Sequence, residues 1–91
     1  MSGTRQRNAI TDYFGQPDTA EGSVNEPRLR DEHGFRFNEK WTYRRPAHDP
    51  ANAVERIIYW QRYDYVGSVI RAAPDSPWQS DDGLLAAVGA A

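Results

Sequence analysis

The chain has 91 residues and a net charge of −2 at pH 7, so it forms one small domain at most, and broad electrostatic adhesion to nucleic acid or anionic membranes is disfavoured. The absence of cysteine excludes disulfide bonds and thiolate zinc sites and favours an intracellular chain. No apolar run resembles a signal peptide or reaches the ~20 residues of a membrane span, so we expect a cytoplasmic protein that makes no membrane contact.

Residues 1–14 are expected to contain a short amphipathic helix. Ile10, Tyr13 and Phe14 follow the i, i+3, i+4 spacing of one helix face, and Gly15 then ends the helix. These three apolar side chains form a candidate partner-binding patch in an otherwise polar segment.

The same stretch resembles a known docking motif. The run from Ile10 to Phe14 is similar to the PCNA-interacting peptide, which reads glutamine, two residues, an aliphatic, two residues and two aromatics. This chain departs from that motif at its first position, where Arg7 replaces glutamine. The resemblance implies that Ile10, Tyr13 and Phe14 enter one pocket of a sliding clamp, so a clamp-bound regulator is one functional hypothesis.

Residues 15–34 have the composition of a connector. Glycine, proline, serine, asparagine and acidic residues dominate them, and a structureless stretch of this length is unusual inside a compact domain. We therefore expect residues 1–33 to be a flexible, extended N-terminal arm that adds little to stability, and residues 34–91 to be the folded domain.

Residues 35–45 are predicted to form a β-hairpin. Residues 35–37 and 40–44 are dense in aromatic and β-branched side chains, which favour strands, and 38–39 would be the turn. One continuous strand over 35–44 is the alternative.

Arginines alternate with aromatics in this hairpin and around it. Exposed aromatics flanked by basic groups are typical of surfaces that bind single-stranded nucleic acid. A small nucleic-acid-binding module is therefore a second functional hypothesis. Its candidate residues are Arg36, Trp41, Tyr43, Arg44 and Arg45.

A long helix is predicted from Asp49 to Ala73, because a wide apolar arc and a polar arc separate at 3.6 residues per turn. Asp49 suits the N-cap, Pro50 the first helical position, and Pro74 forbids continuation. A strand over 57–70 is the competing interpretation, since this stretch is rich in residues that favour strands.

On the helical interpretation, Trp60 interrupts the polar arc and is the strongest candidate for a buried contact with a partner protein. The polar residues that would surround it are Arg56, Asp64 and Arg71. The alternative is that the C-terminal tail, through Trp78, Leu84 or Leu85, covers this side chain within the chain.

A short C-terminal helix is predicted after Ser80, which could cap it. Asp81 and Asp82 would lie in its first turn, where the helix dipole favours acidic groups. Its apolar contacts would be Leu84, Leu85 and Val88.

No pattern in the sequence predicts catalysis, a cofactor or a metal site. His33 and His48 each stand beside an acid but lack a metal-ligand spacing, and the chain has no glycine-rich phosphate loop or nucleophile elbow. We expect a small single α+β domain, a hairpin packed on one long helix with an extended arm and a short C-terminal helix. Its predicted role is that of a non-enzymatic accessory or adaptor protein, a small subunit of a larger assembly or a homo-oligomer.

Overall fold

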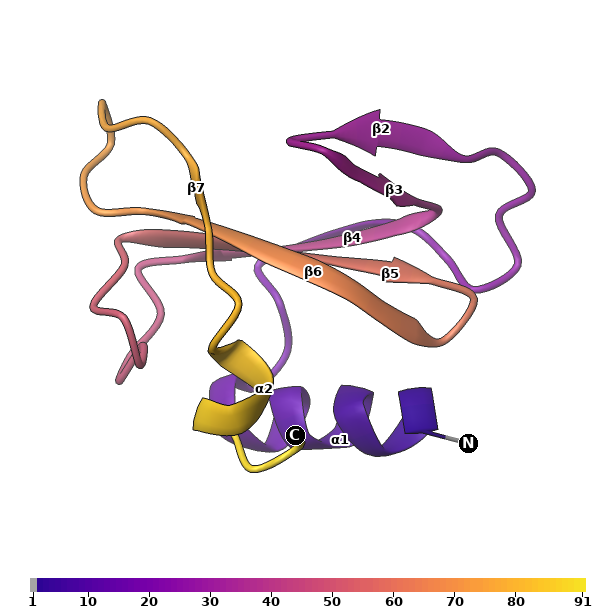
Figure 1. The fold of residues 1–91 in the computed structure, drawn as a ribbon, viewed down its shortest axis with the longest axis horizontal. Coiled ribbons are helices and arrows are strands. Elements are labelled where there is room, and N and C mark those ends of the chain that lie inside the picture. The colour runs from indigo at the N-terminus through magenta and orange to yellow at the C-terminus, as the bar shows by residue number, and fades with distance from the viewer. Residues whose placement is uncertain (1) are drawn as a thin grey trace.

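The computed structural model describes residues 2–91, and it combines two helices with two antiparallel sheets (Figure 1). In chain order the elements are α1 (Ser2–Phe14), β1 (Thr19–Gly22), β2 (Arg30–Glu32), β3 (Phe35–Phe37), β4 (Glu39–Arg44), β5 (Glu55–Gln61), β6 (Asp64–Arg71), β7 (Gln79–Ser80) and α2 (Leu84–Ala87). The predicted α+β class of a small single domain is confirmed. Neither helix in the described part of the chain is long and apolar enough to cross a membrane.

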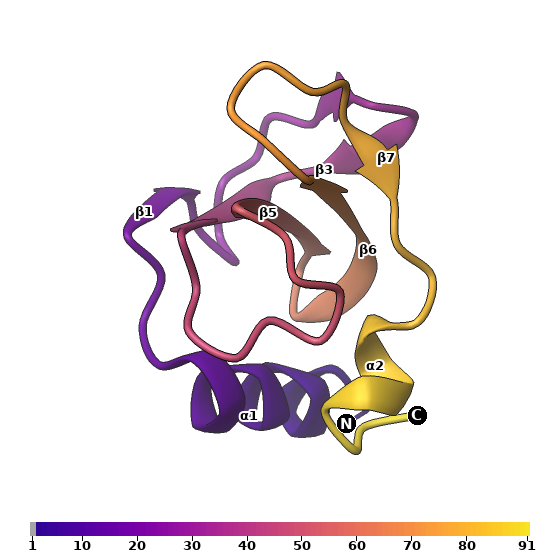
Figure 2. The same cartoon turned by 90° about the vertical axis from the view of Figure 1, so that its left-hand side faces the viewer.

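The elements form three layers around the larger sheet, as Figures 1 and 2 show. That sheet has five antiparallel strands in the order β1-β4-β5-β6-β7, while β2 and β3 form a separate two-stranded sheet. The two helices lie below the five-stranded sheet, and β2 and β3 lie above it. Each interface has its own apolar cluster, so the central strands are covered on both faces.

The long helix predicted over 49–73 is wrong, because this stretch forms the β5–β6 hairpin. All five inner residues of β5 are buried. Ile58 and Trp60 belong to the cluster between the five-stranded sheet and the helices, whereas Ile57 and Tyr59 belong to the cluster between that sheet and β2 and β3. A strand covered on both faces loses the apolar–polar alternation that identifies strands, and its continuous apolar run then also fits a helical pattern.

The predicted hairpin over 35–45 has strands where expected, but the two strands do not pair with each other. β3 pairs with β2, and β4 pairs with β1 and β5. The chain passes between the two sheets at Asn38, which is buried. Its side-chain Nδ2 donates to the carbonyls of Val24 and Glu26, so Asn38 joins the two layers rather than forming a turn.

The extended N-terminal arm is also corrected, because its residues form α1, β1 and β2. α1 is a 13-residue helix, in agreement with the predicted short helix, and its Ile10 is fully buried in the cluster under the sheet. β1 adds an edge strand to β4. The division of the chain at residue 34 stays a prediction, and a truncation proposed below tests it.

The C-terminal helix is present as α2 and is four residues long. Leu84 is fully buried, and Leu85 and Val88 pack against the same cluster, as predicted. Ser80 does not cap it, because Ser80 ends β7 and Gly83 holds the N-cap position.

Close packing above the sheet explains a glycine in the middle of β6. A Cβ atom added to Gly67 would lie 2.3 Å from Cε1 of Phe35, which is shorter than any real contact. The Phe35 ring therefore rests directly on the backbone of β6, and this contact places β3 over the sheet.

Candidate functional site

Trp60, the predicted interface residue, lies in the core with 0% of its surface exposed. It packs among Trp41, Ile58 and Leu84, with 4.9 Å between its ring centre and that of Trp41. The C-terminal segment therefore covers Trp60 within the chain, as the alternative interpretation held, and Trp60 is not exposed to a partner. Its Nε1 has no hydrogen-bond partner among the described residues.

Arg56, predicted to face water beside Trp60, is also fully buried. Its Nε donates to Asp49 Oδ1 at 2.7 Å, and its Nη1 donates to Ser68 Oγ at 2.9 Å and to Asp81 Oδ2 at 2.8 Å. Burial alone would raise the pKa of Asp49, but the bonds from Arg56 and from two backbone amides outweigh it and lower that pKa. Arg56 thus ties the 45–54 loop, β6 and the C-terminal segment together.

Arg7 has a similar structural role between α1 and the sheet. It makes a two-pronged ion pair with Glu39, at 2.8 and 3.2 Å, and Glu39 also accepts a bond from Trp41 Nε1 at 3.0 Å. The Arg7 guanidinium lies 4.8 Å from the Trp41 ring centre and 5.7 Å from that of Tyr63. The residue that departs from the clamp motif is therefore used to fix α1 on its own domain.

The titratable groups above the sheet are likewise bonded to one another. Tyr59 Oη donates to Glu32 Oε1 at 2.6 Å, and Lys40 Nζ lies 2.9 Å from the same oxygen. Burial and the Glu32 carboxylate both raise the pKa of Tyr59. These bonds fasten β2 to the five-stranded sheet.

The residues that resemble the clamp-binding motif are mostly turned inward. Ile10 is fully buried, and the ring of Phe14 lies 5.0 Å from that of Tyr43. Tyr13 is 40% exposed, and its hydroxyl donates to the His48 carbonyl at 2.7 Å. Of the three motif side chains, only Tyr13 presents a large surface to a partner.

The predicted nucleic-acid residues are divided between core and surface. Trp41 and Tyr43 are buried under the sheet, so neither ring is free to stack on a base. Arg36 is exposed and paired with Asp31 at 3.1 Å. Arg44 and Arg45 are exposed at the end of β4, and they return below as part of a separate site.

Arg71, the remaining residue of the predicted interface rim, is half-buried at the end of β6. Its Nε donates to Glu55 Oε1 at 2.9 Å, and its guanidinium lies 4.6 Å from the Trp78 ring centre. Asp64, by contrast, is exposed at the start of β6.

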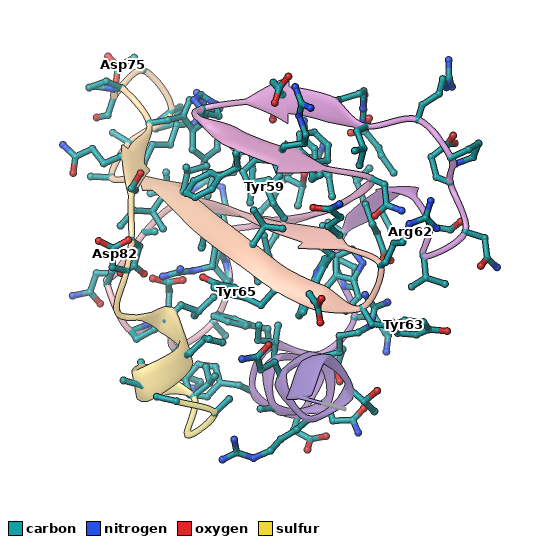
Figure 3. All side chains as sticks on the ribbon, turned by 45° about the vertical axis from the view of Figure 1, so that its right-hand side comes forward. Tyr59, Arg62, Tyr63, Tyr65, Asp75 and Asp82 are labelled. Carbon is teal, nitrogen blue, oxygen red and sulfur yellow. The ribbon has the colours of Figure 1, made fainter. Side chains whose placement is uncertain are left out.

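The most unusual exposed feature is the tip of the β5–β6 hairpin, which we define as Arg62, Tyr63 and Asp64. Gln61 pairs with Asp64, so the turn has only two residues, and both have a positive φ: 48° at Arg62 and 77° at Tyr63. Two-residue turns with positive φ at both positions are type I′, which strongly prefers Asn-Gly. Figure 3 shows Arg62 and Tyr63 at one end of the hairpin, far from Asp75 at the other.

Sequence reasoning missed this tip because it carries no turn signal of its own. The available signal was the pattern around it: two runs rich in β-branched and aromatic residues, 57–60 and 65–70, stand on either side of a short polar stretch. Strand formers on both sides of such a stretch indicate a hairpin even without glycine.

Neither the side-chain chemistry nor comparison with known proteins assigns the chain an activity. Among the described residues, no group of three or more histidine, aspartate or glutamate side chains is arranged to hold a metal ion. His33 packs beside Trp78 at the β2–β3 turn, with ring centres 5.7 Å apart. No family model, curated protein or solved structure matches this chain.

Proposed function

We propose that this chain is a non-enzymatic accessory protein that binds a larger protein through the tip of its β5–β6 hairpin. The observation that carries the proposal is the presence of arginine and tyrosine, both exposed, at two positions whose backbone favours asparagine and glycine. The backbone conformation of the turn therefore gives no reason for these two residue types.

The backbone conformation of the tip has an energetic cost. A left-handed conformation costs a residue with a Cβ atom roughly 1–2 kcal/mol, and such strain is found mainly where function requires it. Tyrosine and arginine are also the residues that contribute most often to binding energy at protein interfaces. Tyr63, with 43% of its surface exposed, offers an aromatic ring that a partner pocket can enclose.

Two contacts anchor the tip to the rest of the domain. The backbone N–H of Arg62 donates to the buried Asn38 side chain at 3.1 Å, and Arg7 lies against the ring of Tyr63. A surface that is ordered in advance loses less conformational entropy on association, and more of its contact energy then appears as affinity.

The chemistry of the tip defines the partner. A recess that encloses the Tyr63 ring, with a carboxylate for Arg62 and a donor for Asp64, would complement all three side chains. We therefore expect a protein with a concave, partly apolar surface, and the hairpin tip to insert into it.

Comparative affinity purification tests this proposal. The bait variant Arg62→Asn/Tyr63→Gly keeps a two-residue turn but removes both side chains, and Tyr13→Ala/Leu29→Ala removes the two other large exposed hydrophobic residues. A genuine partner is captured by the wild type and by the control variant and is depleted at least about tenfold with the tip variant, as the loss of a hot spot of 1.4 kcal/mol or more requires.

The captured protein is then purified and titrated against the three forms by calorimetry. The expected result is the same tenfold weakening for the tip variant alone. Equal affinity for all three forms, or weakening by the control variant only, would assign the contact to another surface. Sedimentation of the wild type alone shows whether a second copy of the chain is the partner.

The two other functional hypotheses have less support. Docking on a sliding clamp through Ile10 and Phe14 would require α1 to leave the sheet, because both side chains pack against the core. Base stacking on Trp41 and Tyr43 would require the helices to move away from the same face.

A further inference from the structure

A second surface feature, at the opposite end of the hairpin, is a hollow of about 280 Å³ between the ends of β4, β5 and β6. We call it the arginine hollow. Its lining residues are Arg44, Arg45, Val54, Glu55, Arg71 and Pro74. Three arginines and one glutamate therefore line one opening.

The strand register explains why these charges gather there. Arg44 lies opposite Glu55 on β5, and Glu55 lies opposite Arg71 on β6. Side chains at paired positions point to the same face of a sheet. Arg45 follows β4 directly, its backbone N–H donates to the Val54 carbonyl at 2.7 Å, and it also lines the hollow.

Two of the three guanidinium groups have donors to spare. Arg71 directs its Nε and Nη2 at Glu55 Oε1, and this pair is close to neutral. Arg44 donates only Nη1, to Thr19 Oγ1 at 3.1 Å, and within the described part of the chain the Arg45 side chain makes no hydrogen bond or ion pair. Asp18 is the other acid nearby, and it accepts a bond from the Arg44 backbone N–H at 2.6 Å.

We propose that the arginine hollow binds the phosphate group of a small phosphorylated molecule. Guanidinium groups present paired donors whose geometry matches the oxygens of phosphate, and two such groups can receive one dianion. Val54 and Pro74 supply apolar walls against which the remainder of a small ligand can pack.

The hollow is separate from the hairpin tip. The tip precedes β6 and Arg71 ends it, and a strand of eight residues is ~25 Å long at about 3.3 Å per residue. Ligand binding in the hollow therefore does not depend on the protein interaction proposed above, and either proposal can fail alone.

The test is a titration of the ¹⁵N-labelled protein, followed by backbone and arginine Nε resonances at constant ionic strength. The probes are inorganic phosphate, ribose 5-phosphate, unphosphorylated ribose and a short oligothymidylate. We expect saturable shifts at Arg44, Arg45 and Val54 with phosphate, tighter binding of ribose 5-phosphate and no effect of ribose.

Two exposed-arginine variants make the test specific. Arg44→Gln/Arg45→Gln removes both available guanidinium groups, and Arg28→Gln/Arg36→Gln removes the same charge from exposed positions elsewhere. Because a bond to a charged group contributes more than a neutral one, we expect at least about tenfold weaker binding for the first variant and no change for the second.

Three outcomes would overturn the proposal. The first is an absence of saturable shifts with either phosphate probe, and the second is equal weakening by both variants, which would indicate only general charge attraction. The third is tight binding of the oligothymidylate alone, which would indicate a nucleic-acid surface instead of a small-molecule site.

Discussion

Arg56 and Arg62 stand on the same hairpin and have opposite surroundings. Arg56 is fully buried, and Asp49, Ser68 and Asp81 accept its hydrogen bonds. Arg62 is exposed, and its backbone is in the left-handed region. The first arginine stabilises the fold at the interface of sheet and loops, whereas the second occupies a conformation that its side chain disfavours. Residue type alone therefore does not distinguish an arginine that stabilises the fold from one available to a partner. The position of the arginine, in a covered strand or in an exposed turn, makes that distinction.

The largest expected loss of stability follows from removing residues 1–33, which help to bury the core around Arg56 and Trp60. A chain that starts at Gly34 lacks α1, β1 and β2, and it exposes Trp41 and Trp60 by losing Ile10 from their cluster. The sequence alone favours a removable arm, but these contacts favour loss of the cooperative unfolding transition. Calorimetry of the truncated chain decides, and a melting temperature within a few degrees of the full chain would restore the removable arm.

Replacing Arg56 tests directly whether this buried arginine stabilises the fold. Arg56→Ala leaves Asp49 and Asp81 without their cation, and breaking one side of a buried ion pair typically costs about 3–5 kcal/mol. The matched variant Arg62→Ala should change the free energy of unfolding by less than about 1 kcal/mol, because it removes an exposed side chain. Urea unfolding of both variants measures the contrast, and equal losses would show that the two arginines are not distinct.

The dependence of stability on acidic pH tests the carboxylate partner of Arg56. The pKa of Asp49 is lowered in the folded state from an ordinary 3.8, so its contribution is fully present above that value and is lost as the pH falls through the folded pKa. We expect Asp49→Asn to be less stable than the wild type at neutral pH and to lose less stability on acidification below about pH 4. Urea midpoints measured at a series of pH values provide the test; parallel curves for the two proteins would assign the acid sensitivity to other groups.

How much of this could be foreseen depends on what each residue contacts. The class, α1, the strands at 35–37 and 40–44 and the C-terminal helix follow from local pattern, because Ile10, Leu84 and their neighbours meet one face only. The β5–β6 hairpin does not follow from local pattern. Ile57 and Ile58 pack against two different layers, so apolar residues do not alternate with polar ones along the strand. The same error moved Trp60 and Arg56 to the surface, although their side chains are the largest fully buried ones.

The smallest expected change in stability is at the exposed hairpin tip. Whether that change is a gain or a loss is what tests the comparison with Arg56. Tyr63→Gly relieves left-handed strain of roughly 1–2 kcal/mol, and Arg62→Asn relieves a smaller part because asparagine still carries a Cβ atom but tolerates this conformation better. The double variant also loses the contact of Arg7 with the Tyr63 ring, which is worth about 0.5–1 kcal/mol. The balance favours the variant by up to about 1 kcal/mol, so its urea midpoint should rise slightly while partner binding falls. Arg62→Asn alone keeps the tyrosine and should give part of the gain. A variant that is less stable than the wild type would mean that the tip side chains serve the fold, and the contrast with Arg56 would then disappear.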